Sequence, residues 1–319
     1  MNNKFMKKGS CLILAGLLAV GMTACGKPSA KKLSTAAEKK IEAKEITLED
    51  LEDEDNSEKN QKALKKGMFL NTTGEEIEDV FEDELKDYDL EEMGEAYGIN
   101  LDGWEVEDFK NISIYAKADT DKFNTTYKDL DIQYVAVIEF EDKKQSDELF
   151  EELMDKFEDL ADDADIDLED LSKDEYLNKG NKGHLIVNLE AATVVEALFE
   201  ELEKENGETL DKDVVKQYKD MVGDLRIVIG IYYEGGVLTT IIGISEDDME
   251  DISTLAKAIG VKDPLTIESS DEMAKGILTL YTSGFSNYLS NAKAAAQQIQ
   301  DHNAEVEAVV DEINEAFEG

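Results

Sequence analysis

The chain of 319 residues contains very few of the residues that stabilise small secreted domains or carry common chemistry. It has two cysteines, two histidines, two prolines, one tryptophan and a single arginine, Arg226. Two cysteines cannot build a disulfide framework or a four-cysteine zinc site. Hydrophobic residues make up 41% of the chain, so a folded protein must be held together mainly by packing.

Positive charge is also scarce. The chain has 33 basic and 76 acidic residues, which gives a formal net charge of −43. Nucleic acids are bound by Lys and Arg side chains that neutralise phosphates, so we exclude a nucleic acid as a partner. The same charge disfavours close contact with anionic lipid headgroups, except through the locally basic residues that follow Cys25.

The common catalytic motifs are missing as well. No GxSxG, HExxH or glycine-rich phosphate loop occurs in the sequence. His302 belongs to a polar helical stretch, and His184 stands at the start of a strand, where we expect an exposed, structurally incidental side chain. The sequence therefore predicts no catalytic residue and no cofactor, and it favours a protein that is not an enzyme.

Two single residues have alternative interpretations. Arg226 can clamp the carboxylate of a ligand in bidentate fashion, but pairing with a neighbouring acid is the expected role. Trp104 can stack on a sugar or a peptide, although a lone tryptophan usually anchors the edge of a core.

One acidic run has the alternating spacing of calcium ligands: Asp163, Asp165, Asp167 and Glu169. The sixth position of this run is Leu168 instead of the glycine of a calcium loop, and the twelfth is Asp174 instead of glutamate. We therefore predict no metal site. Calcium binding between Asp163 and Asp170 stays open as the alternative to a solvated acidic segment whose Ile166 and Leu168 pack inward.

The start of the chain has the three-part pattern of a secretory signal. A cationic stretch with Lys4, Lys7 and Lys8 precedes an apolar run from Cys11 to Val20, and small residues follow. The apolar run is about half of the ~20 residues that a membrane-spanning helix needs. We therefore expect a signal that is removed.

The residues Met22-Thr23-Ala24-Cys25 resemble the lipobox of bacterial lipoproteins. The resemblance covers only the first 26 residues. It implies that the Cys25 thiolate receives a diacylglyceryl group, that a signal peptidase cuts between Ala24 and Cys25, and that the lipid holds the protein on the outer face of the cell membrane. Cys11 leaves with the signal, so the mature chain has no free thiol.

Three regions follow from composition. Residues 1–24 form the signal peptide. Residues 25–66 are polar and charged without a clear apolar stripe, which predicts a flexible linker that gives the domain reach from the bilayer. Residues 67–319 form the globular domain, with a helical part from about residue 265 that packs either on the domain or on a partner.

Within this domain the periodicity of apolar residues predicts strands and helices. Strands are expected at 105–117, 131–140, 185–189, 226–233 and 237–244, the last two joined by a tight turn at Gly235-Gly236. Helices are expected over 74–97, from Ser146 onward, around 194–202 and over 249–259. Together they predict an α+β fold: a mixed, mainly antiparallel sheet covered by amphipathic helices, with a helical C-terminal segment.

The sequence thus favours a membrane-tethered, extracytoplasmic lipoprotein whose domain is a non-enzymatic binding or envelope-associated module. Its partners are the membrane, through the lipid on Cys25, and either an envelope protein or a small-molecule ligand. The alternative is the solute-binding lipoprotein of a transporter, which would have two α/β lobes around a cleft.

Overall fold

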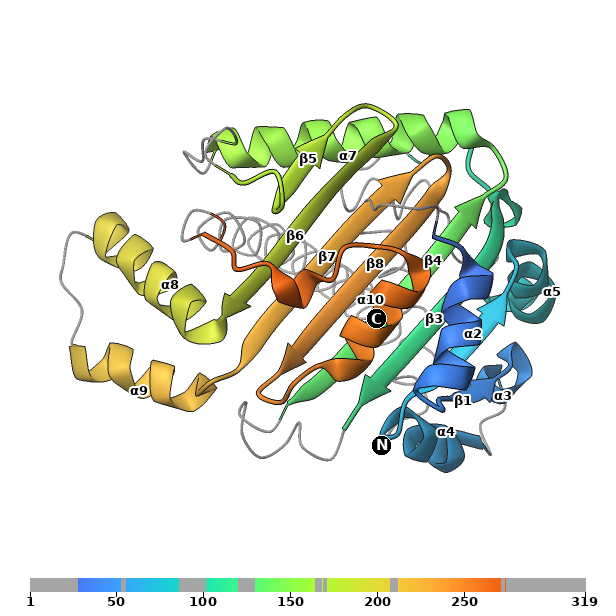
Figure 1. Cartoon of the computed structure of the whole chain (residues 1–319), viewed down its shortest axis with the longest axis horizontal. Helices are drawn as coiled ribbons and strands as arrows, with labels where there is room; N and C mark the ends of the chain where they lie inside the picture. The colour runs from blue at the N-terminus through green and yellow to red at the C-terminus, as the bar shows by residue number, and fades with distance from the viewer. Residues whose placement is uncertain are drawn as a thin grey trace, which may run out of the picture.

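The described part of the protein is built around one central sheet. A computed structural model describes residues 28–52, 56–85, 101, 103–119, 130–163, 168, 171–206, 212–270 and 273. These residues form one eight-stranded sheet with the order β1-β2-β3-β4-β8-β7-β6-β5 (Figure 1). Strands β1 and β2 are parallel, and all other neighbouring pairs are antiparallel. The predicted α+β class with a mixed, mainly antiparallel sheet is confirmed.

The strands are β1 (Lys44–Ile46), β2 (Met68–Thr72), β3 (Phe109–Ala118), β4 (Asp131–Phe140), β5 (Tyr176–Asn178), β6 (Lys182–Glu190), β7 (Arg226–Glu234) and β8 (Val237–Ser245). The predicted hairpin joins β7 and β8, where Gly235 and Gly236 have φ angles of 61° and 86°. Positive φ at both central residues is what a two-residue primed turn requires, and glycine adopts it without steric cost.

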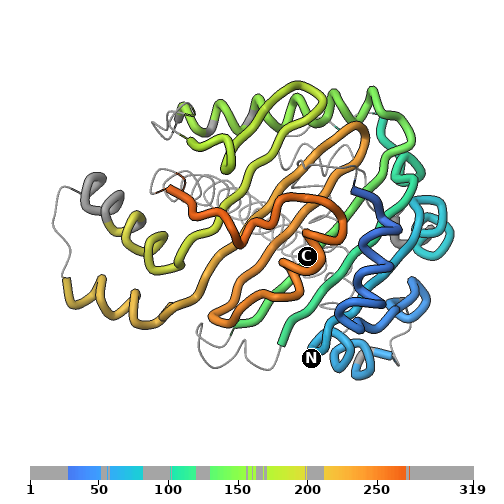
Figure 2. The backbone as a smooth tube through the Cα atoms, in the orientation of Figure 1, coloured from blue at the N-terminus to red at the C-terminus, as the bar shows by residue number. Residues whose placement is uncertain are grey.

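The helices are α2 (Ala30–Lys40), α3 (Leu48–Glu52), α4 (Ser57–Leu64), α5 (Gly74–Leu85), α7 (Lys143–Asp163), α8 (Ala191–Asn206), α9 (Lys212–Val222) and α10 (Glu250–Ile259), with short 3-10 helices η2 (Val106–Asp108) and η5 (Pro264–Thr266). Helices α2 and α10 lie side by side on one face of the sheet (Figures 1 and 2). Residues of α3, α4, α5 and α7 pack into a core on the other face.

Strand β4 shows how the sheet separates two hydrophobic cores. Ala136 and Ile138 lie in the core beneath α5 and α7, whereas Val135 and Val137 lie in the core beneath α2 and α10. Successive side chains of a strand point to opposite faces, so β4 can bury both sets. The predicted face of β4 that carries Ile138 is confirmed, and the opposite face is buried as well.

The prediction of a flexible linker over 25–66 is wrong for the described residues 28–52 and 56–66. Helix α2 buries Leu33 and Ala37 completely against the sheet, and Ile46 of β1 lies in the core on the other face. Alanine contributes little to an apolar stripe, yet its small side chain lets a helix approach a sheet closely. The described part of this stretch therefore belongs to the folded domain, and its first residue, Pro28, is itself buried.

The expected helical C-terminal part from about residue 265 lies outside the described residues, apart from 265–270 and Met273. Within that stretch the structure has the 3-10 turn η5 followed by extended chain. Met273 is 2% exposed and packs in a third cluster with Leu185 and Val187 of β6.

Candidate functional site

The residue that the sequence marks most clearly, Cys25, lies outside the described residues, as does Ala24. The structure does show where the chain that leads from it joins the domain. The backbone amide of Ala30 donates a hydrogen bond to Glu139 Oε1 at 2.9 Å. The other oxygen of that carboxylate, Oε2, accepts from the Asn111 side-chain amide at 3.0 Å. The start of α2 is thereby fixed to the end of β4 and the beginning of β3.

This end of the sheet also carries exposed lysines. Lys110 Nζ lies 2.5 Å from a carboxylate oxygen of Glu141, and Lys144 Nζ lies 2.5 Å from Glu148 Oε1. The carbonyl of Gly236 in the β7–β8 turn accepts from the amide of Phe140 at 3.0 Å, so this turn lies at the same end. We call the surface formed by Lys110, Glu139, Lys143 and Lys144, next to the start of α2, the tether end.

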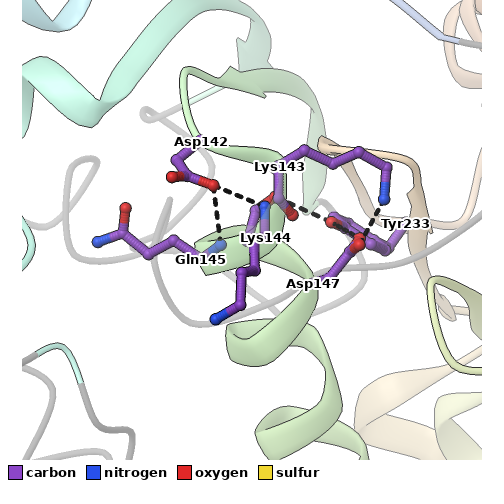
Figure 3. A network of polar contacts seen from close by, with 7 residues as sticks. Asp142, Lys143, Lys144, Gln145, Asp147 and Tyr233 are labelled. Atoms are coloured by element: carbon purple, nitrogen blue, oxygen red, sulfur yellow. Dashed lines mark hydrogen bonds and ion pairs between the residues drawn. The ribbon is translucent and has the colours of Figure 1, made fainter.

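A polar network joins the first turn of α7 to the sheet beside the tether end (Figure 3). Asp142 Oδ1 accepts hydrogen bonds from the backbone amides of Lys144 at 2.7 Å and Gln145 at 3.2 Å, which caps the helix. Asp147 forms an ion pair with Lys143. It also accepts a hydrogen bond of 2.5 Å from the hydroxyl of Tyr233.

The same network contains a serine but lacks the features of a nucleophile. Ser146 Oγ lies 2.9 Å from the Tyr233 hydroxyl and bonds to the carbonyl oxygen of Lys143. Burial, and then the hydrogen bond to Asp147, raise the pKa of Tyr233, so its hydroxyl stays protonated and cannot act as a base at neutral pH. Ser146 is 1% exposed. The arrangement therefore holds α7 against β7, and the buried Ser146 hydroxyl is not accessible to a substrate.

An apolar cavity of about 60 Å³ lies between β1, β2, β3 and β4, with Ile46, Met68, Ile114, Ala116 and Tyr134 in its lining. This volume is far below the roughly 300 Å³ at which small-molecule pockets begin. The hydroxyl of Tyr134 is buried and has no hydrogen-bond partner among the residues that the structure describes, and burial raises the pKa of its phenol. An unpaired hydroxyl beside an apolar cavity costs stability.

The sequence placed Tyr134 on an apolar face, and the structure agrees. It gave no signal for the cavity or for the unpaired hydroxyl, since both depend on side chains from β1 and β2. The network of Ser146, Asp147 and Tyr233 was missed because its members come from two separate elements, α7 and β7. Asp147 and Tyr233 lie 86 residues apart in the sequence.

His184 is buried, whereas the sequence led us to expect an exposed side chain. Its Nε2 lies 3.0 Å from the carbonyl oxygen of Lys173, because the segment before β5 folds over the outer side of β6. Burial lowers the pKa of His184. A buried imidazole whose Nε2 is held by a backbone carbonyl is poorly placed to act as a general base.

The two single residues have structural partners. Arg226 is exposed, and its Nε donates to Asn188 Oδ1 at 3.2 Å, so its observed partner is an amide and not the expected acid. Trp104 is 9% exposed and packs against Phe109 and Phe140, with ring centroids 6.1 Å and 5.5 Å apart. The interpretation of Trp104 as the anchor of a core edge is confirmed.

The acidic run lies mostly outside the described residues, which leave out Asp165, Ile166, Asp167, Glu169 and Asp170. Asp163 is the last residue of α7, and Leu168 packs against the cluster that contains Met273. Asp174 pairs with Lys262. In the part of the chain that the structure describes, no three His, Cys, Asp or Glu side chains come together in a way that could hold a metal ion. His302 also lies outside this part.

No known protein family, curated protein or solved structure matches the chain. Among the helices in the described ranges, none is both long enough and apolar enough to cross a membrane.

Proposed function

We propose that this protein is a bacterial lipoprotein, held on the outer face of the cell membrane by a lipid on Cys25. The observation that carries the proposal is the order of a cationic start, an apolar run of about half a membrane span and the residues Met22-Thr23-Ala24-Cys25. Pro28, three residues after Cys25, is buried in the domain.

We further propose that the domain acts by binding to a component of the envelope and not by catalysis. Three polar groups in the described ranges that could support a reaction are engaged in the fold. Asp147 binds Tyr233 and Lys143, Ser146 is buried, and His184 Nε2 contacts a carbonyl. Covalent catalysis by this serine would need a base beside it and access to a substrate.

The alternative, a solute-binding lipoprotein, gains no support from the geometry. All eight described strands belong to one sheet, whereas such a protein would have two lobes. The cavity next to Tyr134 is too small for a sugar, an amino acid or a peptide.

Two cysteine variants test the anchor. Cys25→Ser removes the thiol that would carry the lipid, and Cys11→Ser is the matched control, because Cys11 belongs to the removed signal. In bacterial cells that process lipoproteins, we expect wild type and Cys11→Ser to sediment with membranes and to carry a diacylglyceryl mass on the N-terminal peptide. Cys25→Ser should lose both properties. An unmodified Cys25 in native material, or a retained signal, contradicts the proposal.

A second experiment tests whether the domain acts by catalysis. The purified domain is incubated with peptidoglycan fragments, envelope peptides and phospholipids, and products are sought by mass spectrometry. We expect no turnover. Turnover that a single substitution abolishes would show that the domain is an enzyme.

A further inference from the structure

The connection between the lipidated residue and the folded domain is very short. Only Gly26 and Lys27 separate Cys25 from Pro28, which is buried. An extended chain spans at most about 3.3–3.6 Å per residue, so the Cα atom of Cys25 lies within about 11 Å of that of Pro28. This limit holds for any conformation of the two intervening residues.

Local unfolding of α2, which would lengthen this tether, costs free energy. The amide of Ala30 is bound by Glu139, and Ser29 caps α2 by accepting from the amide of Lys32. Four residues later, Leu33 is completely buried. Releasing the first turns of α2 would expose this leucine and leave the Glu139 carboxylate without its backbone donor, so the tether stays short while the protein is folded.

We propose that the tether end lies directly against the outer leaflet of the membrane, so that the protein works at the lipid surface and not at a distance from it. The inference rests on the proposed lipid on Cys25. The sheet then points away from the bilayer, because β8 runs from Val237 near the tether end to Ser245 at the opposite end. Eight steps of about 3.3 Å separate these ends by about 26 Å.

The charge at the two ends of the sheet is mixed, since Lys39, Lys40, Lys44 and Lys66 are exposed at the end opposite the tether and Glu141 and Asp142 are exposed at the tether end. Lys31, Lys32, Lys110 and Lys144 are exposed at or beside the tether end. At the opposite end, the turn after β8 exposes the consecutive acids Glu246, Asp247 and Asp248. Anionic headgroups attract lysine and repel carboxylates within about 8 Å at physiological ionic strength. Glu141 and Glu148 neutralise part of the lysine charge at the tether end, so the short tether, and not the charge, is the cause of the proposed orientation.

Single-cysteine labelling tests the orientation in the full lipidated protein. The mature chain has no cysteine except Cys25, whose sulfur carries the lipid, so a fluorophore can be placed at one chosen site. Lys144→Cys marks the tether end, where the Lys144 side chain is 81% exposed. Asp247→Cys, also at an exposed position, marks the opposite end. The lipidated proteins are reconstituted in phosphatidylcholine and phosphatidylglycerol vesicles that contain a lipid with a nitroxide on its headgroup.

We expect quenching at position 144 to be several-fold stronger than at position 247. Equal quenching, or stronger quenching at 247, overturns the inference. The mass of the N-terminal peptide is measured first in each preparation. An unmodified Cys25 shows that the proposed anchor is wrong, whereas a modified Cys25 without the quenching difference shows that only the orientation is wrong.

A spacer variant tests whether the short tether is the cause. Twelve Gly and Ser residues inserted between Lys27 and Pro28 add a mean reach of about 19 Å without touching the fold. We expect the quenching at position 144 to fall toward the level at position 247. If quenching at 144 is unchanged, the tether does not set the orientation and the inference fails.

Discussion

The hydroxyl of Tyr115 on β3 donates a hydrogen bond of 2.8 Å to Asp251 Oδ2 on α10, which joins two elements that are 136 residues apart in the sequence. The Tyr115 side chain is completely buried beneath α2 and α10. Burial, and then the negative charge of Asp251, raise the pKa of Tyr115 well above its ordinary value. The hydroxyl therefore keeps its proton and remains a donor at neutral pH.

The first prediction removes this hydrogen bond. Tyr115→Phe should lower the free energy of unfolding by about 1.5–2 kcal/mol, the lower part of the range for a bond to a charged acceptor, since the partly exposed Asp251 keeps Lys117 as an ion-pair partner and can bind water. The measurement is a urea titration, in which the midpoint falls and the slope stays constant. An unchanged midpoint would mean that this bond does not contribute to stability.

The second prediction uses Tyr134→Phe, which makes the same chemical change at a hydroxyl that has no partner. Here the substitution removes a buried polar group without breaking a bond, so the free energy of unfolding should rise by about 1 kcal/mol. Both variants lose one tyrosine oxygen, so the change in volume is the same. The opposite signs of the two changes in the free energy of unfolding therefore isolate the effect of the hydrogen-bond partner. A loss of stability in Tyr134→Phe would show that its hydroxyl binds a water molecule or another group in solution.

Local patterns were sufficient to predict the central part of the sheet. Strand β4 was predicted over its full length, because Tyr134, Ala136 and Ile138 alternate with other residues at period two. The β7–β8 hairpin followed from Gly235-Gly236, and the end of α10 followed from Gly260, whose φ angle is 86°. In each case the residues that determine the structure are neighbours in the sequence.

The elements before residue 73 could not be found in this way. Helix α2 buries three alanines together with Leu33, which gives a weak hydropathy signal, and its contacts come from β3 and α10 far along the chain. Strand β1 has only three residues and is held by parallel pairing with β2. The burial of His184 was missed because it depends on the segment around Lys173, which covers the outer side of β6.

The third prediction concerns pH. Burial depresses the pKa of His184 in the folded protein, so the unfolded chain binds the proton more tightly. The contribution of neutral His184 to stability is therefore fully present above the unfolded pKa of about 6.5 and is lost as the pH falls through the folded pKa.

Urea titrations at about pH 8 and about pH 5.5 test this dependence. Wild type should lose more stability between these values than His184→Gln, which cannot titrate but keeps an amide near the Lys173 carbonyl. His302 is present in both proteins, so its contribution cancels, as do those of the carboxylates. Equal losses in the two proteins would show that His184 is accessible to protons in the folded state.

The last prediction distinguishes a structural α2 from a linker. Leu33→Ala should lower the free energy of unfolding by about 2–4 kcal/mol, because Leu33 is completely buried and its removal leaves a cavity against the sheet. Thr35→Ala, on the exposed side of the same helix, is the matched control and should change stability by less than about 0.5 kcal/mol. Urea titration of the chain from Pro28 onward measures both without interference from the lipid.

If these residues formed a flexible linker, neither substitution would change the free energy of unfolding, and the domain would be free to move away from the membrane. A large loss in Leu33→Ala alone would show that the helix is part of the fold, which is the condition under which a tether of two residues can hold the domain at the lipid surface.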